Sequence, residues 1–153
     1  MLLRLASLNA AYAAALDADR LEQWPDFFTE DCLYKVTTAE NYRKGLQAGV
    51  IYADSRDMLH DRVFALRKAN IYEPQSYRHI IGLPAILDQT AEVTTAEAPF
   101  VVVRTMRDGE MKIFAAGRYL DRVRDDTAGR LRFAERLVIC DSPRFDTLLA
   151  IPL

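Results

Sequence analysis

The chain has 153 residues, a length typical of a single domain that can bury a core. Half of the residues are apolar and the net charge is −2, which excludes the strong phosphate attraction of a nucleic-acid-binding protein. No apolar run approaches the ~20 residues of a membrane span. The length predicts one domain over residues 1–153, and two cysteines in apolar strand patterns without metal-type spacing predict a cytoplasmic protein.

The first residues are predicted to form a helix rather than a secretion signal. Apolar side chains recur at helical spacing over residues 3–17, and Asn9 interrupts the apolar run that a signal would need. A second, short helix is expected to start near Asp19, with Glu22 completing a capping box and Pro25 kinking or restarting it.

Residues 24–34, with the sequence WPDFFTEDCLY, mark a change from helix to strand. Apolar residues up to Phe28 continue one helical face, whereas from Cys32 onward they alternate, which predicts a strand over about 32–38. Two roles stay open for Asp31 at this corner. It is a turn carboxylate bonded to local backbone N–H groups, or an acid/base group aimed into a cavity beneath the aromatic residues.

A second strand at 50–53 and a helix over about 56–69 follow a polar connection. Leu59 and Val63 belong to the buried stripe of this helix. Phe64 falls on its polar side, which indicates either a contact with another chain or a partly exposed aromatic ring.

Beyond residue 74 the chain is almost entirely strand-like. Hairpin signals in the last three strands predict an antiparallel meander. Helices followed by a curled antiparallel sheet make an α+β fold, which we expect to be a cone-like open barrel closed by the N-terminal helices and one further helix. The expected strands are 76–82, 92–107, 112–124 and 130–141.

Arginine dominates the basic residues, with sixteen arginines against four lysines. Strict alternation groups the arginines of the last two strands on one side of each strand and puts Glu135 on the apolar side of the last one. Ordinary cross-strand pairing explains most of this pattern, and contact with a partner subunit is the alternative. These arginines are Arg118, Arg122, Arg124, Arg130, Arg132 and Arg136.

The sequence holds few groups for chemistry. Its two histidines and two cysteines stand alone, without HExxH, CxxC, a phosphate loop or a nucleophile elbow. Cys32 and Cys140 are expected to be reduced core thiols, with a disulfide left open. His79 either points into an enclosed space beside Asp31 and Tyr34, or is a core or interface histidine satisfied by hydrogen bonds.

An ordered set of segments along nearly the whole chain resembles a known family. It resembles the small (β) subunits of aromatic-ring-hydroxylating dioxygenases, which belong to the cone-shaped superfamily of nuclear transport factor 2 and scytalone dehydratase. The likeness is greatest to subunits that serve aromatic carboxylates such as terephthalate, salicylate or anthranilate. The segments are WPDFFTEDCLY, Asp54 with the 59–62 helix, Pro74 with YRHIIG, GRYLDRVR, and ERLVICD with a short apolar tail.

The resemblance implies a subunit without a redox centre or cofactor of its own. A Rieske-type α subunit would carry the 2Fe–2S cluster and the mononuclear iron and would receive electrons from a reductase or ferredoxin. This chain would form a homotrimer within a three-plus-three hexamer. Two histidines cannot supply both iron sites. Candidate contact residues are Phe64, Arg78, His79, Arg118, Arg122, Arg130, Arg132 and Arg136.

The alternative is a stand-alone dehydratase- or isomerase-type enzyme of the same cone fold, or a small-molecule binding module. An acid/base enzyme would place a carboxylate or histidine with tyrosines around a carbonyl substrate. The residues available for that role are Asp31, Tyr34, Tyr52 and His79. A neighbouring reading frame with a Rieske CxH and CxxH pattern would favour the subunit hypothesis.

Overall fold

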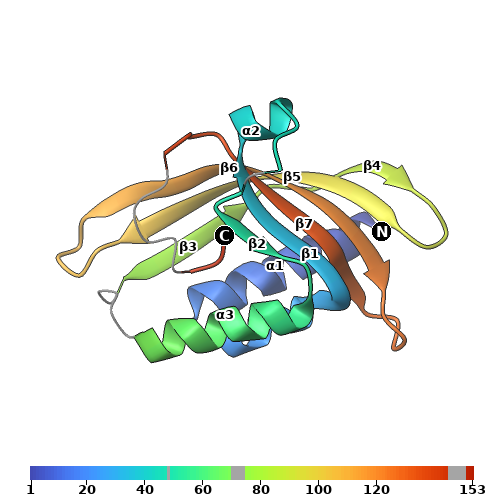
Figure 1. The fold of residues 1–153 in the computed structure, drawn as a ribbon, viewed down its shortest axis with the longest axis horizontal. Coiled ribbons are helices and arrows are strands. Elements are labelled where there is room, and N and C mark those ends of the chain that lie inside the picture. The colour runs from blue at the N-terminus through green and yellow to red at the C-terminus, as the bar shows by residue number, and fades with distance from the viewer. Residues whose placement is uncertain (48, 70–74, 145–150) are drawn as a thin grey trace.

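In the computed structural model, a curled sheet of seven strands covers helices on its inner side (Figure 1). The structure describes residues 1–47, 49–69, 75–144 and 151–153. The helices are α1 (Leu2–Asp17), the 3-10 helix η1 (Leu21–Phe27), α2 (Ala39–Arg43) and α3 (Arg56–Ala69). The strands are β1 (Phe28–Thr38), β2 (Ile51–Ala53), β3 (Ser76–Ile81), β4 (Ala85–Gln89), β5 (Thr94–Thr105), β6 (Met111–Asp125) and β7 (Leu131–Cys140).

The strand order is β2-β1-β7-β6-β5-β3, and β4 pairs with β5 beyond this path. The α+β class and the curled, unclosed sheet are confirmed. Every pair is antiparallel except β1 with β7, which run parallel. The long excursion between these two strands makes parallel pairing possible, because a parallel neighbour needs a long crossover.

The predicted helices α1 and α3 form at the expected positions, and both lie on the inner side of the sheet (Figure 1). On α1, the apolar residues at helical spacing are buried, and Tyr12 is completely covered. On α3, Leu59 and Val63 are buried, whereas Phe64 is 62% exposed, as its place on the polar side predicts. No helix in the described ranges is long and apolar enough to cross a bilayer.

The predicted capping box is wrong. η1 begins without a side-chain cap, and Asp19 adopts a φ of 56°. The carboxylates of Asp19 and Glu22 instead accept hydrogen bonds from Arg67 on α3, at 2.9 and 2.7 Å. The guanidinium of Arg67, distant in sequence, thus binds the two carboxylates that the local pattern assigned to a helix cap.

Two elements differ from the sequence prediction because their backbone partners lie far away in the chain. β1 already begins at Phe28, where it pairs with Phe133 of β7. β4 was not predicted, since all five of its residues are exposed and leave no alternating burial pattern. It exists by pairing with β5.

A β-bulge in β7 reverses the predicted faces of that strand. Val123 pairs with Phe133 but Arg122 pairs with Glu135, so Ala134 is the extra residue. Beyond the bulge each side chain points to the side opposite the one that strict alternation predicts. Arg136 is therefore buried and Glu135 is not, which corrects both assignments.

Candidate functional site

The core of the cone is a cluster of aromatic rings between α1, η1 and the sheet. Trp24 is completely buried and meets Phe28 and Tyr34 edge to face, with ring centroids 5.8 and 5.1 Å apart. Its indole Nε1 donates to the hydroxyl of Tyr12 at 3.1 Å. These aromatic side chains fill the part of the cone beneath the curve of the sheet.

Of the four residues proposed for acid/base chemistry, Tyr34 and His79 point inward. The hydroxyl of Tyr34 donates to the backbone oxygen of Leu153 at 3.2 Å and accepts from the Leu153 N–H at 3.1 Å. Burial raises the pKa of Tyr34 well above its usual value. The hydroxyl therefore stays protonated and serves as a neutral hydrogen-bond donor.

The His79 side chain is fully covered and lies between two acceptors. Its Nδ1 is 2.7 Å from Asp17 Oδ1, and its Nε2 is 3.2 Å from the backbone oxygen of Pro152. Its own backbone N–H also donates to the Asp17 carboxylate, at 3.0 Å. The expectation of a core histidine satisfied by hydrogen bonds agrees with this geometry, whereas an exposed contact through the His79 ring does not.

The other two proposed acid/base residues lie elsewhere. Asp31 sits in the irregular part of β1, where it is exposed and pairs with Arg124 of β6. Tyr52 on β2 is 54% exposed. The hypothesis that Asp31 points into a cavity is wrong, because the bulged strand turns its carboxylate toward solvent. The four residues therefore do not form one catalytic set.

The structure contains a buried ion pair that the sequence pattern does not predict. Arg136 donates from Nε and Nη2 to the two carboxylate oxygens of Asp121, both at 2.8 Å, and from Nη2 to Asn9 Oδ1 at 2.6 Å. Burial raises the pKa of Asp121, and the guanidinium opposes that shift. The polar Asn9 within the apolar stripe of α1 was the available signal.

Three aromatic rings surround the Arg136 guanidinium. Its central carbon lies 3.8, 4.0 and 4.4 Å from the ring centroids of Phe133, Tyr119 and Tyr12. Arg136 Nη1 has no hydrogen-bond partner among the described residues, and the negative ring faces compensate part of its charge. Arg136 is 0% exposed and cannot contact another subunit, which corrects its place among the candidate contact residues.

The described part of the chain contains no group of three or more His, Cys, Asp and Glu side chains that could hold a metal ion. Cys32 and Cys140 are free and buried. Burial raises the pKa of the Cys32 thiol to about 11 and that of Cys140 to about 12. Both are therefore core thiols of low reactivity, as the sequence predicts.

Most of the remaining candidate contact residues are exposed, and several pair with acids. Arg118 bonds Glu97 at 3.1 Å, Arg122 lies 3.9 Å from Glu135, and Arg130 bonds Asp126 at 3.0 Å. Arg132 is mostly covered, and Arg78 borders a surface groove of about 450 Å³ between α1 and β3.

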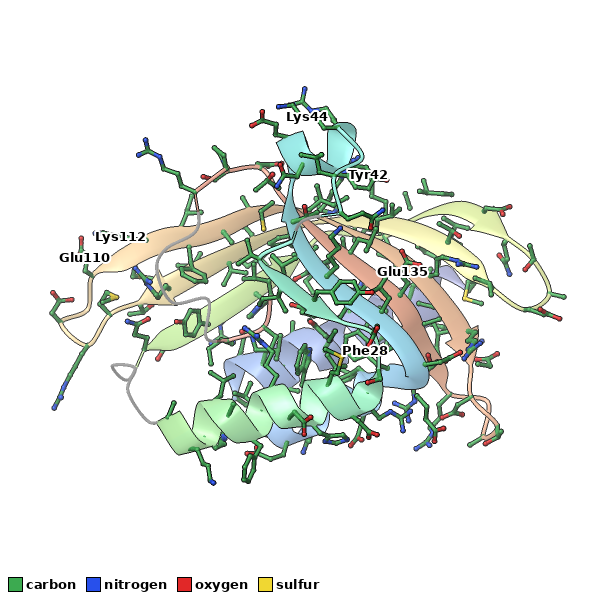
Figure 2. All side chains as sticks on the ribbon, in the orientation of Figure 1. Phe28, Tyr42, Lys44, Glu110, Lys112 and Glu135 are labelled. Atoms are coloured by element: carbon green, nitrogen blue, oxygen red, sulfur yellow. The ribbon has the colours of Figure 1, made fainter. Side chains whose placement is uncertain are left out.

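Apolar side chains are also exposed near the edge strand β3 and along the β5–β6 hairpin. They are Ile80, Leu83, Met111 and Ile113. In Figure 2, Glu110 and Lys112 mark the end of this hairpin, far from the helices. Tyr42 and Lys44 mark the α2 region on the opposite side of the sheet from α1 and α3. The sheet thus presents charged and apolar groups away from its helical layer.

Comparison with known proteins connects this fold to a family. The family model described as "Ring hydroxylating beta subunit" matches residues 11–147. Beta subunit 1 of the terminal oxygenase component of terephthalate 1,2-dioxygenase from a Comamonas species is 52% identical over 151 residues, which cover 99% of this chain and 97% of that protein. The small subunit of anthranilate 1,2-dioxygenase from Burkholderia cepacia is 44% identical, with 95% of this chain and 90% of that protein covered.

Solved structures agree with these sequence relatives. The beta subunit of an aromatic-ring-hydroxylating dioxygenase from Novosphingobium aromaticivorans superposes with a TM-score of 0.91 at 46% identity, covering 99% of this chain and 96% of that one. A scytalone dehydratase-type protein from the same species gives a TM-score of 0.69 at 17% identity, covering 96% and 88%, which shows a shared cone fold alone. The chain belongs to the ring-hydroxylating beta subunit family.

Proposed function

We propose that this chain is the non-catalytic β subunit of an oxygenase that hydroxylates an aromatic carboxylate. Its partner is a Rieske-type α subunit, which carries the 2Fe–2S cluster and the mononuclear iron and receives the electrons. The substrate class is inferred from the relatives named for terephthalate and anthranilate, which this chain matches over nearly its whole length. The role of the β chain is to assemble and support the α subunits.

The non-catalytic part of this proposal rests on the hydrogen bonds that the inward-pointing polar side chains make. Tyr34 and His79, the two inward-pointing candidates, bond to backbone atoms of residues 152 and 153. An acid/base enzyme must keep such groups within hydrogen-bond reach of a substrate. Here the chain itself takes their bonds, and Asp31 is too far outside to act with them.

We further propose a homotrimer of this chain within a three-plus-three hexamer. The exposed arginines of β6 and the apolar side chains near β3 supply charged and hydrophobic contacts of the kind that subunit interfaces combine. Closed threefold symmetry would use the same two patches on every copy.

Turnover of Asp31→Asn and His79→Gln in the complex with the α subunit tests the proposal. With a supporting β subunit, the hydroxylation rate per assembled complex stays within a few-fold of wild type, even if less complex forms. Removal of a true proton-transfer group lowers the rate by ~10²–10⁴.

The rate must be normalised to assembled hexamer by gel filtration with light scattering, with Tyr52→Phe as the surface control. The lone chain is assayed in parallel for dehydration or isomerisation of ring ketones. A hundredfold fall in a fully assembled complex, or a mutation-sensitive activity of the lone chain, contradicts the supporting role.

A further inference from the structure

Residues 151–153, here called the tail segment, lie inside the cone. Ile151 is 6% exposed and Leu153 is 1% exposed, and both belong to the same hydrophobic core as Trp24. Pro152 between them is also buried. Figure 1 marks this end of the chain between the sheet and the helices.

Polar side chains from different elements bind the backbone of the tail segment. Two tyrosine hydroxyls converge on the oxygen of Leu153: Tyr12 from α1 at 2.7 Å and Tyr34 from β1 at 3.2 Å. The Leu153 N–H donates to Tyr34 at 3.1 Å, and the oxygen of Pro152 lies 3.2 Å from His79 Nε2 on β3.

Each tyrosine hydroxyl near the Leu153 oxygen donates one hydrogen bond and accepts another. Tyr12 donates its only hydroxyl proton to that oxygen, and it accepts from Trp24 Nε1 at 3.1 Å. Tyr34 donates to the same oxygen while it accepts the Leu153 N–H. Each buried hydroxyl thus has a donor and an acceptor assigned, which fixes its direction.

Simple packing of an apolar chain end requires only apolar surface. This arrangement adds polar side chains from three separate elements. The hydroxyls of Tyr12 and Tyr34 donate to the Leu153 oxygen, and the His79 ring lies beside the Pro152 oxygen. A mostly apolar pocket with a few convergent polar groups is the usual form of a ligand site. Two hydroxyl donors on one oxygen suit a carbonyl or carboxylate group.

We propose that the cone interior is a formed binding site for an apolar group that bears a carbonyl or carboxylate oxygen, and that the tail segment is its resident occupant. Tyr12, Tyr34 and His79 bind the oxygens, and the aromatic core binds the apolar body. This proposal goes beyond the supporting function and does not depend on it, because it concerns the chain itself and not its assembly.

The test removes residues 151–153 from the otherwise full chain and returns them as the peptide N-acetyl-Ile-Pro-Leu. Trp24 is the single tryptophan and bonds Tyr12, so its fluorescence reports on the site. Deletion should change the emission, and the peptide should restore it saturably and raise the melting temperature. The same peptide should leave the full chain unchanged, because the site is occupied.

Tyr34→Phe added to the deletion variant removes the hydroxyl that makes two of the bonds, so it should weaken peptide binding about fivefold or more. Tyr52→Phe is the matched control and should not weaken it. Absence of saturable binding to the folded deletion variant, or equal binding with and without the Tyr34 hydroxyl, overturns the proposal.

If the deletion variant does not fold, amide exchange measured by NMR in the full chain decides. The Leu153 amide should be protected in the wild-type chain, and Tyr34→Phe should speed its exchange about fivefold or more while strand β6 stays protected. Tyr52→Phe should have no effect. Exchange of the wild-type Leu153 amide at the rate of an unstructured peptide, or no response to Tyr34→Phe, overturns the proposal.

Discussion

A buried guanidinium loses its hydrogen bonds to water, and the Arg136 guanidinium replaces them with contacts inside the protein. Its bidentate bond to Asp121, its bond to Asn9 and the surrounding rings together replace water. A buried ion pair contributes little net stability, but removing one of its two residues leaves the other charge buried without a partner. The pair ties α1 to β6 and β7 through a single side chain.

Arg136→Met should therefore destabilise the chain by ~3–5 kcal/mol, since Asp121 then stays buried without its cation. The double variant Arg136→Met with Asp121→Leu should lose less than the single one, because it removes both charges. Chemical denaturation at neutral pH measures both. A loss below about 1 kcal/mol for the single variant would contradict the predicted role.

Trp24 is a packing residue at the centre of the aromatic cluster. Trp24→Ala should cost ~3–5 kcal/mol of unfolding free energy, because the fully buried ring leaves a cavity and Tyr12 loses its donor. Trp24→Phe keeps much of the volume and should cost less. Equal stability of the alanine variant and the wild type in a urea titration would show that the ring carries no packing energy.

At the scale of elements, a single carboxylate organises the β6–β7 hairpin. Asp126 accepts from the backbone N–H groups of Ala128 and Arg130 at 2.9 Å, and Arg130 and Arg132 also donate to it. This hairpin sets the register of the two strands that carry Asp121 and Arg136.

These bonds, above all the backbone N–H of Arg130, lower the pKa of Asp126 from its ordinary value of 3.8 to about 2. A depressed carboxyl pKa stabilises the fold above the unfolded pKa, and that stabilisation is lost as the pH falls from about 4 to about 2. Asp126→Asn should lower the melting temperature at pH 6, and the difference from wild type should shrink toward pH 2. A difference that is constant with pH would contradict the assignment, and Asp108→Asn on the β5–β6 hairpin is the control.

At the scale of the whole molecule, one side of the sheet carries the helical layer and the other side faces away from it (Figure 1). The inner side is filled by aromatic rings, the Arg136 pair and the tail segment. The exposed arginines and apolar groups lie outside this inner side, where the proposed subunit contacts would form. This division explains how a cone-shaped domain can serve assembly.

Light scattering of the isolated chain should give the mass of a trimer at micromolar concentration. Arg118→Gln with Arg122→Gln should raise the dissociation constant ~tenfold or more, because both guanidinium groups lie on the exposed side of β6. Arg20→Gln, an exposed arginine on the helical side, is the control and should not change the mass. A monomer that stays monomeric with and without the α subunit would contradict the proposed assembly.

Local patterns alone were sufficient for much of the fold. Helical spacing predicts α1 and α3, turn residues predict the last two hairpins, and alternation correctly places Tyr119, Asp121 and Val123 on the inner face of β6. These features depend on neighbours within a few residues. The ordered set of segments also carried the family resemblance, since it reflects the same sequence of elements.

Only the tertiary structure decided what depends on distant partners. One extra residue, Ala134, turns Arg136 inward, and strict alternation contains no sign of it. The bulged start of β1 likewise turns Asp31 outward, and an edge pairing creates β4. The roles of Tyr34 and His79 follow from the tail segment, which lies more than seventy residues away from either in sequence. Such contacts are set by the closure of the whole cone and not by any local period.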